Sequence, residues 1–549
     1  ARAPLPEGGG INSGQTTVSV FEGRVIAENA TGRVTLRGGE VATASVGQAP
    51  VTSIPVNPGE QRQAVHWALH YPPILSYRAD DFKEGNETSW QARVRQSIEY
   101  TQAGDLQNAL ASVIDTPQDA TTAFFSYRAS LLLNVGRVNE ANADIKTALN
   151  IAPNDGIALA LQSVIAVAQN QHETALTLSK QSIAQAPQVA GSWMALSYAQ
   201  QANFNLPEAI NAAQHGADNE PDNALAWARI AELHLMTGNL NGALAAASKA
   251  STLNPNLART QSVLGFVYLT QIKTTHARQA FEQAIMLDQA DPLPRLGLGL
   301  AKIRDGDLAA GREEIEIATA LDPNNALVRS YMGKAYYEEK RDPLAATQFD
   351  IAKTLDPKDP TPWFYDAILK QSTNPPVEAL QDLQKSMELN DNRAVYRSRL
   401  LLDQDQAARS ASQARIYSDL GFQQLALVES WKSLAVDPTN YSAHRFLADS
   451  YNALSRHEVA RVSEVLQAQL LQPIHARPVN PSAAETSLLA LEGAGPNRAA
   501  FNEFTSLFSK DRVALQANLN GGTNNTWSDE AVLFGNYRNV AASLGQLHY

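Results

Sequence analysis

The feature that most constrains this chain is a proline that returns at a fixed interval. The interval is 34 residues, and it passes through Pro153, Pro187, Pro221, Pro255, Gln289, Pro323, Pro357 and Asp391. A strict period of this length is the signature of a repeat array, in which each repeat packs only on its neighbours. The 549 residues therefore do not divide into the about three or four independent domains that length alone would suggest.

Other residue types recur at fixed places when the proline is counted as position 32. The repeat from Ala224 to Leu257 has Trp227 at 4, Ile230 at 7, Ala231 at 8, Gly238 at 15, Ala243 at 20 and Ala250 at 27. The next repeat has Leu264, Gly265, Tyr268, Ala277, Phe281 and Ala284 at 7, 8, 11, 20, 24 and 27. This spacing predicts two helices in each repeat, because small residues let them approach and large ones fill the space between them.

The pattern resembles the tetratricopeptide repeat. The resemblance implies a mainly α fold, in which helix pairs stack into a right-handed superhelical α-solenoid with a concave groove. We expect eight repeats in residues 122–393, after a degenerate first pair in residues 76–121. An insertion and two further repeats occupy residues 394–473, which gives about eleven pairs.

A small β-domain is predicted ahead of the helices, in residues 1–75. Between Thr16 and Ser45, alternating apolar residues are broken by glycines, which is typical of short antiparallel strands. The segments VFEGRV, GRVTLRGGEVATASVGQAP and AVHWALHYPPIL resemble a FecR-type domain. That resemblance implies the envelope of a Gram-negative bacterium, either the periplasm, the outer membrane or the cell surface. It also implies that the chain is a fragment of a longer precursor.

Residues 474–549 are predicted to contain a loop and then strands. Val513, Leu515, Ala517 and Leu519 lie on one face and Ala514, Gln516, Asn518 and Asn520 on the other, and residues 530–537 and 540–549 are expected to be the next strands. Such alternation is typical of outer-membrane barrel strands, and the segment from GAGPNRAAFNEF onward resembles the entry to a barrel in the same family. Three strands cannot close a barrel, so we expect them to continue beyond this sequence, pair with another chain or fold onto the solenoid.

Composition argues against several functional classes. The chain has 44 basic and 56 acidic residues, a net charge of −12, which disfavours general nucleic-acid binding. It has no cysteine, so disulfides, thiolate metal sites and cysteine nucleophiles are excluded. We find no nucleotide-binding glycine loop and no nucleophile elbow, and we predict no catalytic residue, no cofactor and no metal.

Two histidines provide the one candidate for metal binding. His66 and His70 stand four residues apart, which would place both rings on one helix face, but no third ligand is evident. We interpret this stretch as a packed linker, with Trp67 and Tyr71 as anchors that dock the β-domain on the first helices. Neighbouring carboxylates such as Glu313 and Glu314 are interpreted as solvated helix faces.

The predicted groove offers a candidate binding surface. In tetratricopeptide arrays, positions 2, 5, 9, 12 and 13 face the concave side. The apolar residues at these positions are Met194, Tyr198, Leu235, Met236, Phe266, Leu296, Leu300, Tyr337 and Phe364. Apolar groups there suit a peptide or helix partner; the alternative is that neighbouring repeats bury them. Position 5 lacks the Lys and Asn of a carboxylate clamp.

Three hypotheses for the function remain. The first is a non-enzymatic envelope scaffold that binds a protein or polymer in the groove, coupled through residues beyond the C-terminus to an outer-membrane barrel for export or assembly. The second is a structural subunit that forms homo-oligomers through its terminal strand edges, giving a filament or surface layer. The third is a signalling module in which the β-domain relays a cue to a membrane partner.

Overall fold

The computed structural model describes most of the helical array and parts of both ends. The described residues are 15–19, 24–29, 31–37, 41–45, 48–53, 71–82, 89–271, 273–373, 375–389, 402–436, 441–452, 459–461, 463–464, 512–521, 527–537 and 540–548. Contacts divide the chain into unit 1, which is Ala1–Asn203 with Ile317–Asn325, and unit 2, which is Phe204–Glu316 with Ala326–Tyr549. Each unit is described by itself.

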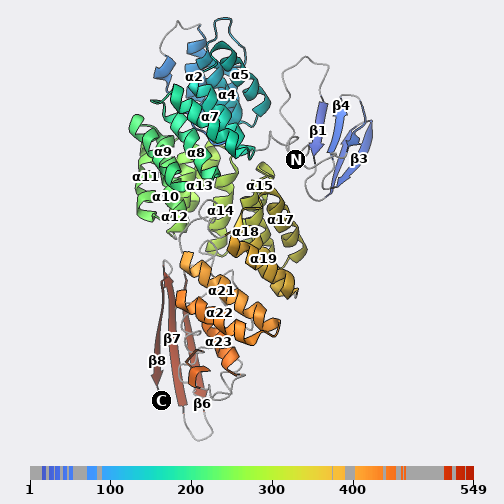
Figure 1. Ribbon diagram of the computed structural model, residues 1–549, viewed down its shortest axis with the longest axis vertical. Coiled ribbons are helices and arrows are strands. Elements are labelled where there is room, and N and C mark those ends of the chain that lie inside the picture. The colour runs from blue at the N-terminus through green and yellow to red at the C-terminus, as the bar shows by residue number, and fades with distance from the viewer. Residues whose placement is uncertain are drawn as a thin grey trace. The chain divides into compact units, whose positions relative to one another are not determined.

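Short antiparallel strands form the start of unit 1, as predicted. Strands β1 (Gln15–Ser19), β4 (Val41–Ser45) and β5 (Val51–Ser53) make one sheet in the order β1-β4-β5. Strands β2 (Arg24–Asn29) and β3 (Gly32–Arg37) form a hairpin (Figure 1). The side chains of Leu36 and Ala42 are buried together, with Ala27 and Val34 packed against them, so this region has a small apolar core of its own.

Helix pairs follow in unit 1. They are preceded by the short 3-10 helix η2 (Ala79–Phe82). The helices are α2 (Trp90–Gln102), α3 (Leu106–Ser112), α4 (Thr122–Asn134), α5 (Val138–Ile151), α6 (Gly156–Ala168), α7 (His172–Gln185) and α8 (Ala190–Ala202). The pairs α2 with α3, α4 with α5 and α6 with α7 each pack within the pair and on the helices that follow, for example α6 on both α7 and α8. The predicted degenerate pair is α2 and α3.

Unit 2 continues the alternation of first and second helices. Its helices, of which α15 runs across the boundary into unit 1, are α9 (Leu206–Asn219), α10 (Ala224–Met236), α11 (Leu240–Leu253), α12 (Ala258–Thr270), α13 (Thr274–Leu287), α14 (Pro292–Asp305), α15 (Leu308–Leu321), α16 (Ala326–Glu338), α17 (Asp342–Leu355), α18 (Pro360–Thr373), α19 (Pro376–Glu388), α21 (Leu402–Asp419), α22 (Gln423–Val436) and α23 (Tyr441–Asn452). Helices α4 to α19 are the eight predicted repeats. Residues 390–393 at the end of the eighth repeat, residues 394–401 of the insertion and the predicted repeat end at Pro473 lie outside the described residues.

The turn between the two helices of a repeat has the same backbone conformation along the array. Position 15 has a positive φ wherever it is described, and the residues there are Gly136, Asn170, Phe204, Gly238, Gly306 and Lys340. This left-handed conformation closes the first helix and suits glycine, because a Cβ atom clashes there. The glycine in the sequence pattern at position 15 thus has a backbone cause.

In the core of a repeat, an aromatic ring packs against glycines, which have no side chain. Phe281 in α13 is fully buried, and a Cβ atom added to Gly265 would lie 2.6 Å from its ring. A Cβ atom on Gly297 of the next repeat would lie 2.2 Å from the same ring. Phe349 meets Gly333 in the same way at 2.5 Å. The aromatic residue at position 24 therefore holds two first helices at close range.

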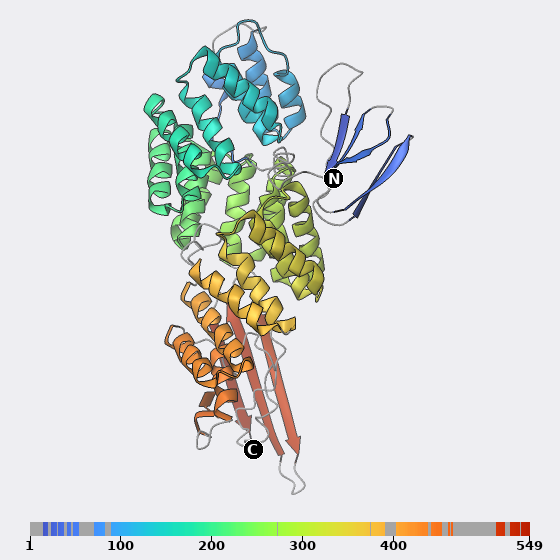
Figure 2. The same cartoon turned by 45° about the vertical axis from the view of Figure 1, so that its right-hand side comes forward.

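The C-terminal strands are also confirmed. Strands β6 (Arg512–Gly521), β7 (Trp527–Tyr537) and β8 (Val540–His548) form an antiparallel sheet in that order, drawn as three long arrows in Figure 2. The hydrogen-bonded register pairs Leu515 with Leu533 and Leu533 with Leu544. Among the described helices, none is both long and apolar enough to cross a membrane.

We predict that Gly265→Ala destabilises the array, because its new methyl group would overlap the buried Phe281 ring. Overpacking of this kind costs about 1–3 kcal/mol. Urea unfolding followed by circular dichroism should show a lower midpoint. Gly242→Ala in α11 is the matched control, since the neighbours of its new methyl group are side-chain atoms of Asn239 and His234 and alanine favours helix. Equal urea midpoints for the two variants would contradict the close packing of the Phe281 ring against Gly265.

Candidate partner-binding surface

The first helices of the repeats share one face, here called the A-helix face. It consists of positions 2, 5, 9, 12 and 13 of α4, α6 and α8 in unit 1 and of α10, α12, α14, α16 and α18 in unit 2. The nine apolar residues named from the sequence all lie on these helices. Their assignment to partner binding stays a prediction.

The exposure of the nine residues separates them into two groups. Six are buried, with at most 8% of the side chain exposed: Met194, Tyr198, Leu296, Leu300, Tyr337 and Phe364. At these six, burial favours the alternative that they pack within the array. Leu235, Met236 and Phe266 are half-buried. Phe266 stacks edge-on against Phe281 at 4.9 Å between ring centroids, so Leu235 and Met236 are the more available pair.

An extended segment of the chain lies against the first helices of unit 1. It comprises Tyr71–Phe82 and is here called the strap. Tyr71 and Ile74 are each 2% exposed, and the side chain of Gln169, the residue that ends α6, hydrogen-bonds Tyr71. Burial raises the pKa of Tyr71 above its ordinary value. Tyr71 is thus buried against the end of α6, and its docking of the β-domain stays a prediction; Trp67, His66 and His70 lie outside the described residues.

The other end of the strap joins an aromatic cluster. The ring of Tyr77 meets that of Tyr127 in α4 edge-on at 5.0 Å and that of Phe82 at 5.8 Å. Phe82 in turn contacts Trp90 of α2 at 6.1 Å, and its carbonyl oxygen accepts a hydrogen bond from Arg95. Burial raises the pKa of Tyr77, and Tyr127 adds to the rise. This end of the strap therefore packs between the first helices of two pairs.

The middle of the strap crosses α8 where that helix lacks a side chain. A Cβ atom on Gly191, at position 2, would lie 2.4 Å from Cδ2 of Leu75 and 3.1 Å from the carbonyl oxygen of Ile74. An alanine in place of Gly191 would therefore overlap both the backbone and a side chain of the strap. The strap reaches from α2 and α4 to α8, across the first helices of the N-terminal pairs.

In unit 2, charged residues lie beside the half-buried apolar pair. Glu232, at position 9 of α10, pairs with Arg259, at position 2 of α12, at 2.6 Å and with Arg229 at 3.0 Å. Arg229 is 1% exposed. The carboxylate of Glu232 thus links α10 to α12, next to Leu235 and Met236 of the same helix.

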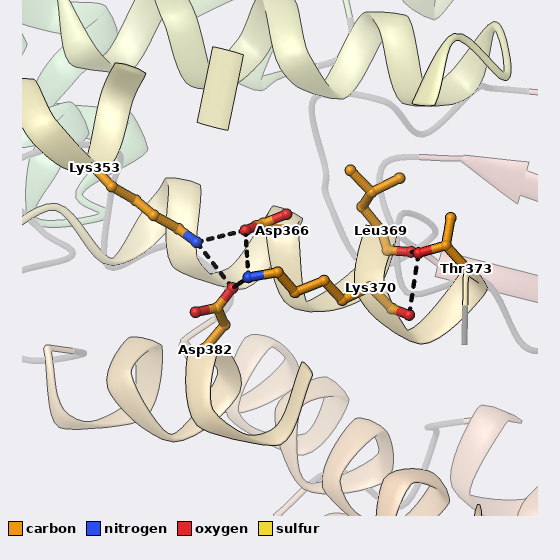
Figure 3. A network of polar contacts seen from close by, with 6 residues as sticks. All are labelled: Lys353, Asp366, Leu369, Lys370, Thr373 and Asp382. Atoms are coloured by element: carbon orange, nitrogen blue, oxygen red, sulfur yellow. Dashed lines mark hydrogen bonds and ion pairs between the residues drawn. The ribbon is translucent and has the colours of Figure 1, made fainter. Parts of the chain in front are cut away.

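A second charged group lies between helices rather than on the A-helix face. Lys353 in α17 and Lys370 in α18 share the carboxylates of Asp366 in α18 and Asp382 in α19 (Figure 3). The distances from Lys370 are 2.9 Å to Asp366 and 2.6 Å to Asp382. Asp366 and Lys370 occupy positions 7 and 11, where some other repeats are apolar, as at Ile230, and others are charged, as at Arg128 and Lys302. The four residues of the network bring two positive and two negative charges together between the helices.

The pKa values of the two carboxylates of this network are shifted in opposite directions. Burial alone would raise the pKa of Asp366, but Lys353 and Lys370 outweigh it and hold the pKa below its ordinary value. Burial and the neighbouring Asp366 raise the pKa of Asp382. Burial would lower the pKa of Lys370, but the two carboxylates raise it, so it stays charged. The shifts at Asp366 and Lys370 thus favour the charged forms of these two groups.

Sequence reasoning predicted a packed linker with Tyr71 as an anchor, but it missed the contacts of the rest of the strap and both charged groups. The strap contains YPPIL, an apolar segment with two prolines between the strands and the first helices, which is the signal that could have extended the prediction to Ile74 and Leu75. The ion pairs that join helices had no such signal, since their partners are 12 to 29 residues apart. The pairs within one helix, Arg229 with Glu232 and Asp366 with Lys370, are three and four residues apart. Within the described ranges, no group of three or more His, Asp or Glu side chains is placed to hold a metal.

Comparisons with known proteins agree with this geometry. Residues 296–360 match a family model described as a tetratricopeptide repeat. The fold is a tetratricopeptide α-solenoid. The crystal structure of the APC/C hetero-tetramer Cut9-Hcn1 is similar with a TM-score of 0.52 at 14% identity, over 70% of this chain and 81% of that chain. No curated protein sequence matches this one.

Other solved structures are similar to the tetratricopeptide array at lower scores. Yeast Tom70 has 13% identity and a TM-score of 0.33, over 70% of this chain and 92% of that chain. The human IFIT1 dimer with m7Gppp-AAAA has 12% identity and a TM-score of 0.43, over 75% of this chain and 95% of that chain. The similarity to Cut9-Hcn1 supports the fold alone.

We predict that Asp366→Asn destabilises the solenoid by about 3 kcal/mol at pH 7, because removing one buried partner leaves a lysine short of a countercharge. Since the folded pKa of Asp366 is lowered, its contribution is fully present above its ordinary pKa of 3.8 and is lost as the pH falls below that value. Thermal unfolding from pH 2 to 8 measures this. The prediction would be contradicted if Asp366→Asn and the wild type differed in unfolding temperature as much at pH 2 as at pH 7.

Proposed function

We propose that this protein is a non-enzymatic scaffold that binds a protein partner through its A-helix face. The tetratricopeptide fold supports a role in protein–protein interaction, because such arrays present an extended surface built from successive repeats. The observation that carries the proposal is the strap. In unit 1, the first helices already hold an extended piece of polypeptide, with buried anchors at Tyr71 and Ile74.

In unit 2, the proposed contact region is the end of α10 with the neighbouring part of α12. Leu235 and Met236 are half-buried there, and Glu232 and Arg259 join the two helices by an ion pair. An apolar patch beside a charged rim is the composition of many protein interfaces. The partner would place apolar side chains on Leu235 and Met236.

We further propose that the scaffold works in the cell envelope and is coupled to an outer-membrane barrel. Two features support this. The N-terminal segments resemble a FecR-type domain, and strand β6 alternates in its register while β6 to β8 form a continuous antiparallel ladder. Within the described sheet, β6 and β8 are the edge strands, so further strands, or another copy of the chain, could add there.

We predict that Leu235→Ser with Met236→Ser weakens capture of the partner from an envelope fraction about tenfold or more, because interface energy concentrates in a few apolar anchors. Affinity capture with quantitative mass spectrometry measures this. Met286→Ser is the matched control, since Met286 lies on the second helix α13 and is 66% exposed. Circular dichroism should be unchanged in both variants. Equal capture by the two variants would move the binding surface away from α10.

We predict that the protein in its native cells is recovered with the outer membrane and needs detergent for release, because barrel strands are held by the bilayer. Cell fractionation followed by immunoblotting measures this. Recovery in the cytoplasmic fraction would contradict the envelope proposal. Recovery as salt-stable assemblies that scatter light and contain the chain alone would favour the filament alternative, in which strand edges of different copies pair.

A further inference from the structure

The strap is bound in the manner of a peptide ligand. Its anchors Tyr71, Ile74 and Phe82 are buried, whereas Arg78 and Asp80 between them are exposed. Tyr77 is held by the rings of Tyr127 and Phe82 rather than by a strand ladder or a helix. The strap contains one short regular element, the 3-10 helix η2 at its end, and residues 71–78 before it are attached by separated side chains that can leave one pocket after another.

Proline residues prepare the strap for this mode of binding. Pro72 and Pro73 restrict the chain to extended conformations before it docks. An extended segment that is already ordered loses less conformational entropy when it binds. The same reasoning applies to any partner segment with this sequence character.

Gly191 indicates that the surface of α8 is suited to an occupant. Alanine at this helical position would favour the helix by itself, since glycine lowers helix stability. The glycine instead leaves room for Leu75 and for the carbonyl oxygen of Ile74, which lie within 2.4 Å and 3.1 Å of where a Cβ atom would be. The absence of that one side chain is therefore explained by close contact with an extended peptide.

The fit of the strap is incomplete at one anchor. The buried hydroxyl of Tyr77 makes no hydrogen bond of good geometry to a described residue, although Ser130 is near enough to oppose the rise of its pKa. A buried hydroxyl without such a bond carries a desolvation penalty that a phenylalanine would not. A competing segment with phenylalanine at this place would bind the same pocket better.

We propose that the strap is a displaceable occupant of a peptide-binding site on α2, α4, α6 and α8. The partner is a protein with an extended segment of the form aromatic, Pro, Pro, aliphatic, aliphatic, any residue, phenylalanine. Binding of that segment expels the strap, so the site is closed until a competitor arrives. This inference rests on the proposed function, since it names the ligand chemistry of the A-helix face in unit 1.

The test uses the full chain with a weakened strap, Ile74→Ala with Tyr77→Ala. The probe is a fluorescein-labelled peptide of residues 71–82 carrying Tyr77→Phe, measured by fluorescence anisotropy. We expect the weakened chain to bind the peptide at least about tenfold more tightly than the wild type, in which the strap reduces the fraction of competent sites. Adding Gly191→Ala to the weakened chain should lower the affinity about tenfold or more, because its methyl group blocks the crossing point.

A control peptide with Ile74→Ala and Tyr77→Ala should not bind. Equal affinities with and without Gly191→Ala would overturn the proposed site. Absence of binding to a weakened chain that keeps its helical circular dichroism would overturn it too. Loss of the fold in that chain would show that the strap is a permanent part of the solenoid, which is also contrary to the proposal. Dimers of the wild type in sedimentation, with straps exchanged, would make a second copy the occupant.

The outcome is separable from that of the proposed function. The peptide test concerns unit 1, whereas Leu235→Ser with Met236→Ser concerns α10 in unit 2. A peptide that fails to bind, together with a partner still lost from the α10 variant, would remove the strap proposal and leave the scaffold function standing.

Discussion

The solenoid depends on the close approach of helices at fixed positions, where a glycine takes the place of a larger residue. Phe281 and Phe349 occupy the space left by glycines at position 8, and Gly299 meets Gly311 backbone to backbone, with an added Cβ atom 2.6 Å from the facing carbonyl oxygen. Each contact joins residues within about one repeat, so the array is assembled from local packing. Everything else on the molecule, including the A-helix face, takes its position from these contacts.

Sequence reasoning predicts those parts of the structure that repeat. Gly265, Phe281 and Ala284 recur with a period that has one physical cause, namely helix approach, and so the helices, the turns and their register follow from it. The terminal strands are likewise predicted, because alternation of Val513 and Leu515 with polar residues is itself the pattern of a strand. The FecR and barrel identities stay predictions.

Features that occur once are the ones that sequence reasoning did not reach. The strap contacts Tyr127, Gln169 and Gly191, three residues in different repeats that no local pattern connects. The burial of Met194, Tyr198 and Leu300 also could not be predicted from their positions in the repeat. A residue at a given position is half-buried in one repeat and buried in another. Phe266 and Tyr198 share position 9 and differ in this way. The candidate site was thus predicted as a face but not as a set of contacts.

The charged network between α17, α18 and α19 has a consequence for how the array can change over evolutionary time. Repeats with interchangeable apolar cores can be duplicated, deleted or exchanged with little penalty, because each new neighbour offers the same surface. Lys353 belongs to one repeat, whereas Asp366, Lys370 and Asp382 belong to the next. Separating them would bury unbalanced charge. These two repeats are therefore expected to be inherited as a pair, which fixes the length of the array at this junction.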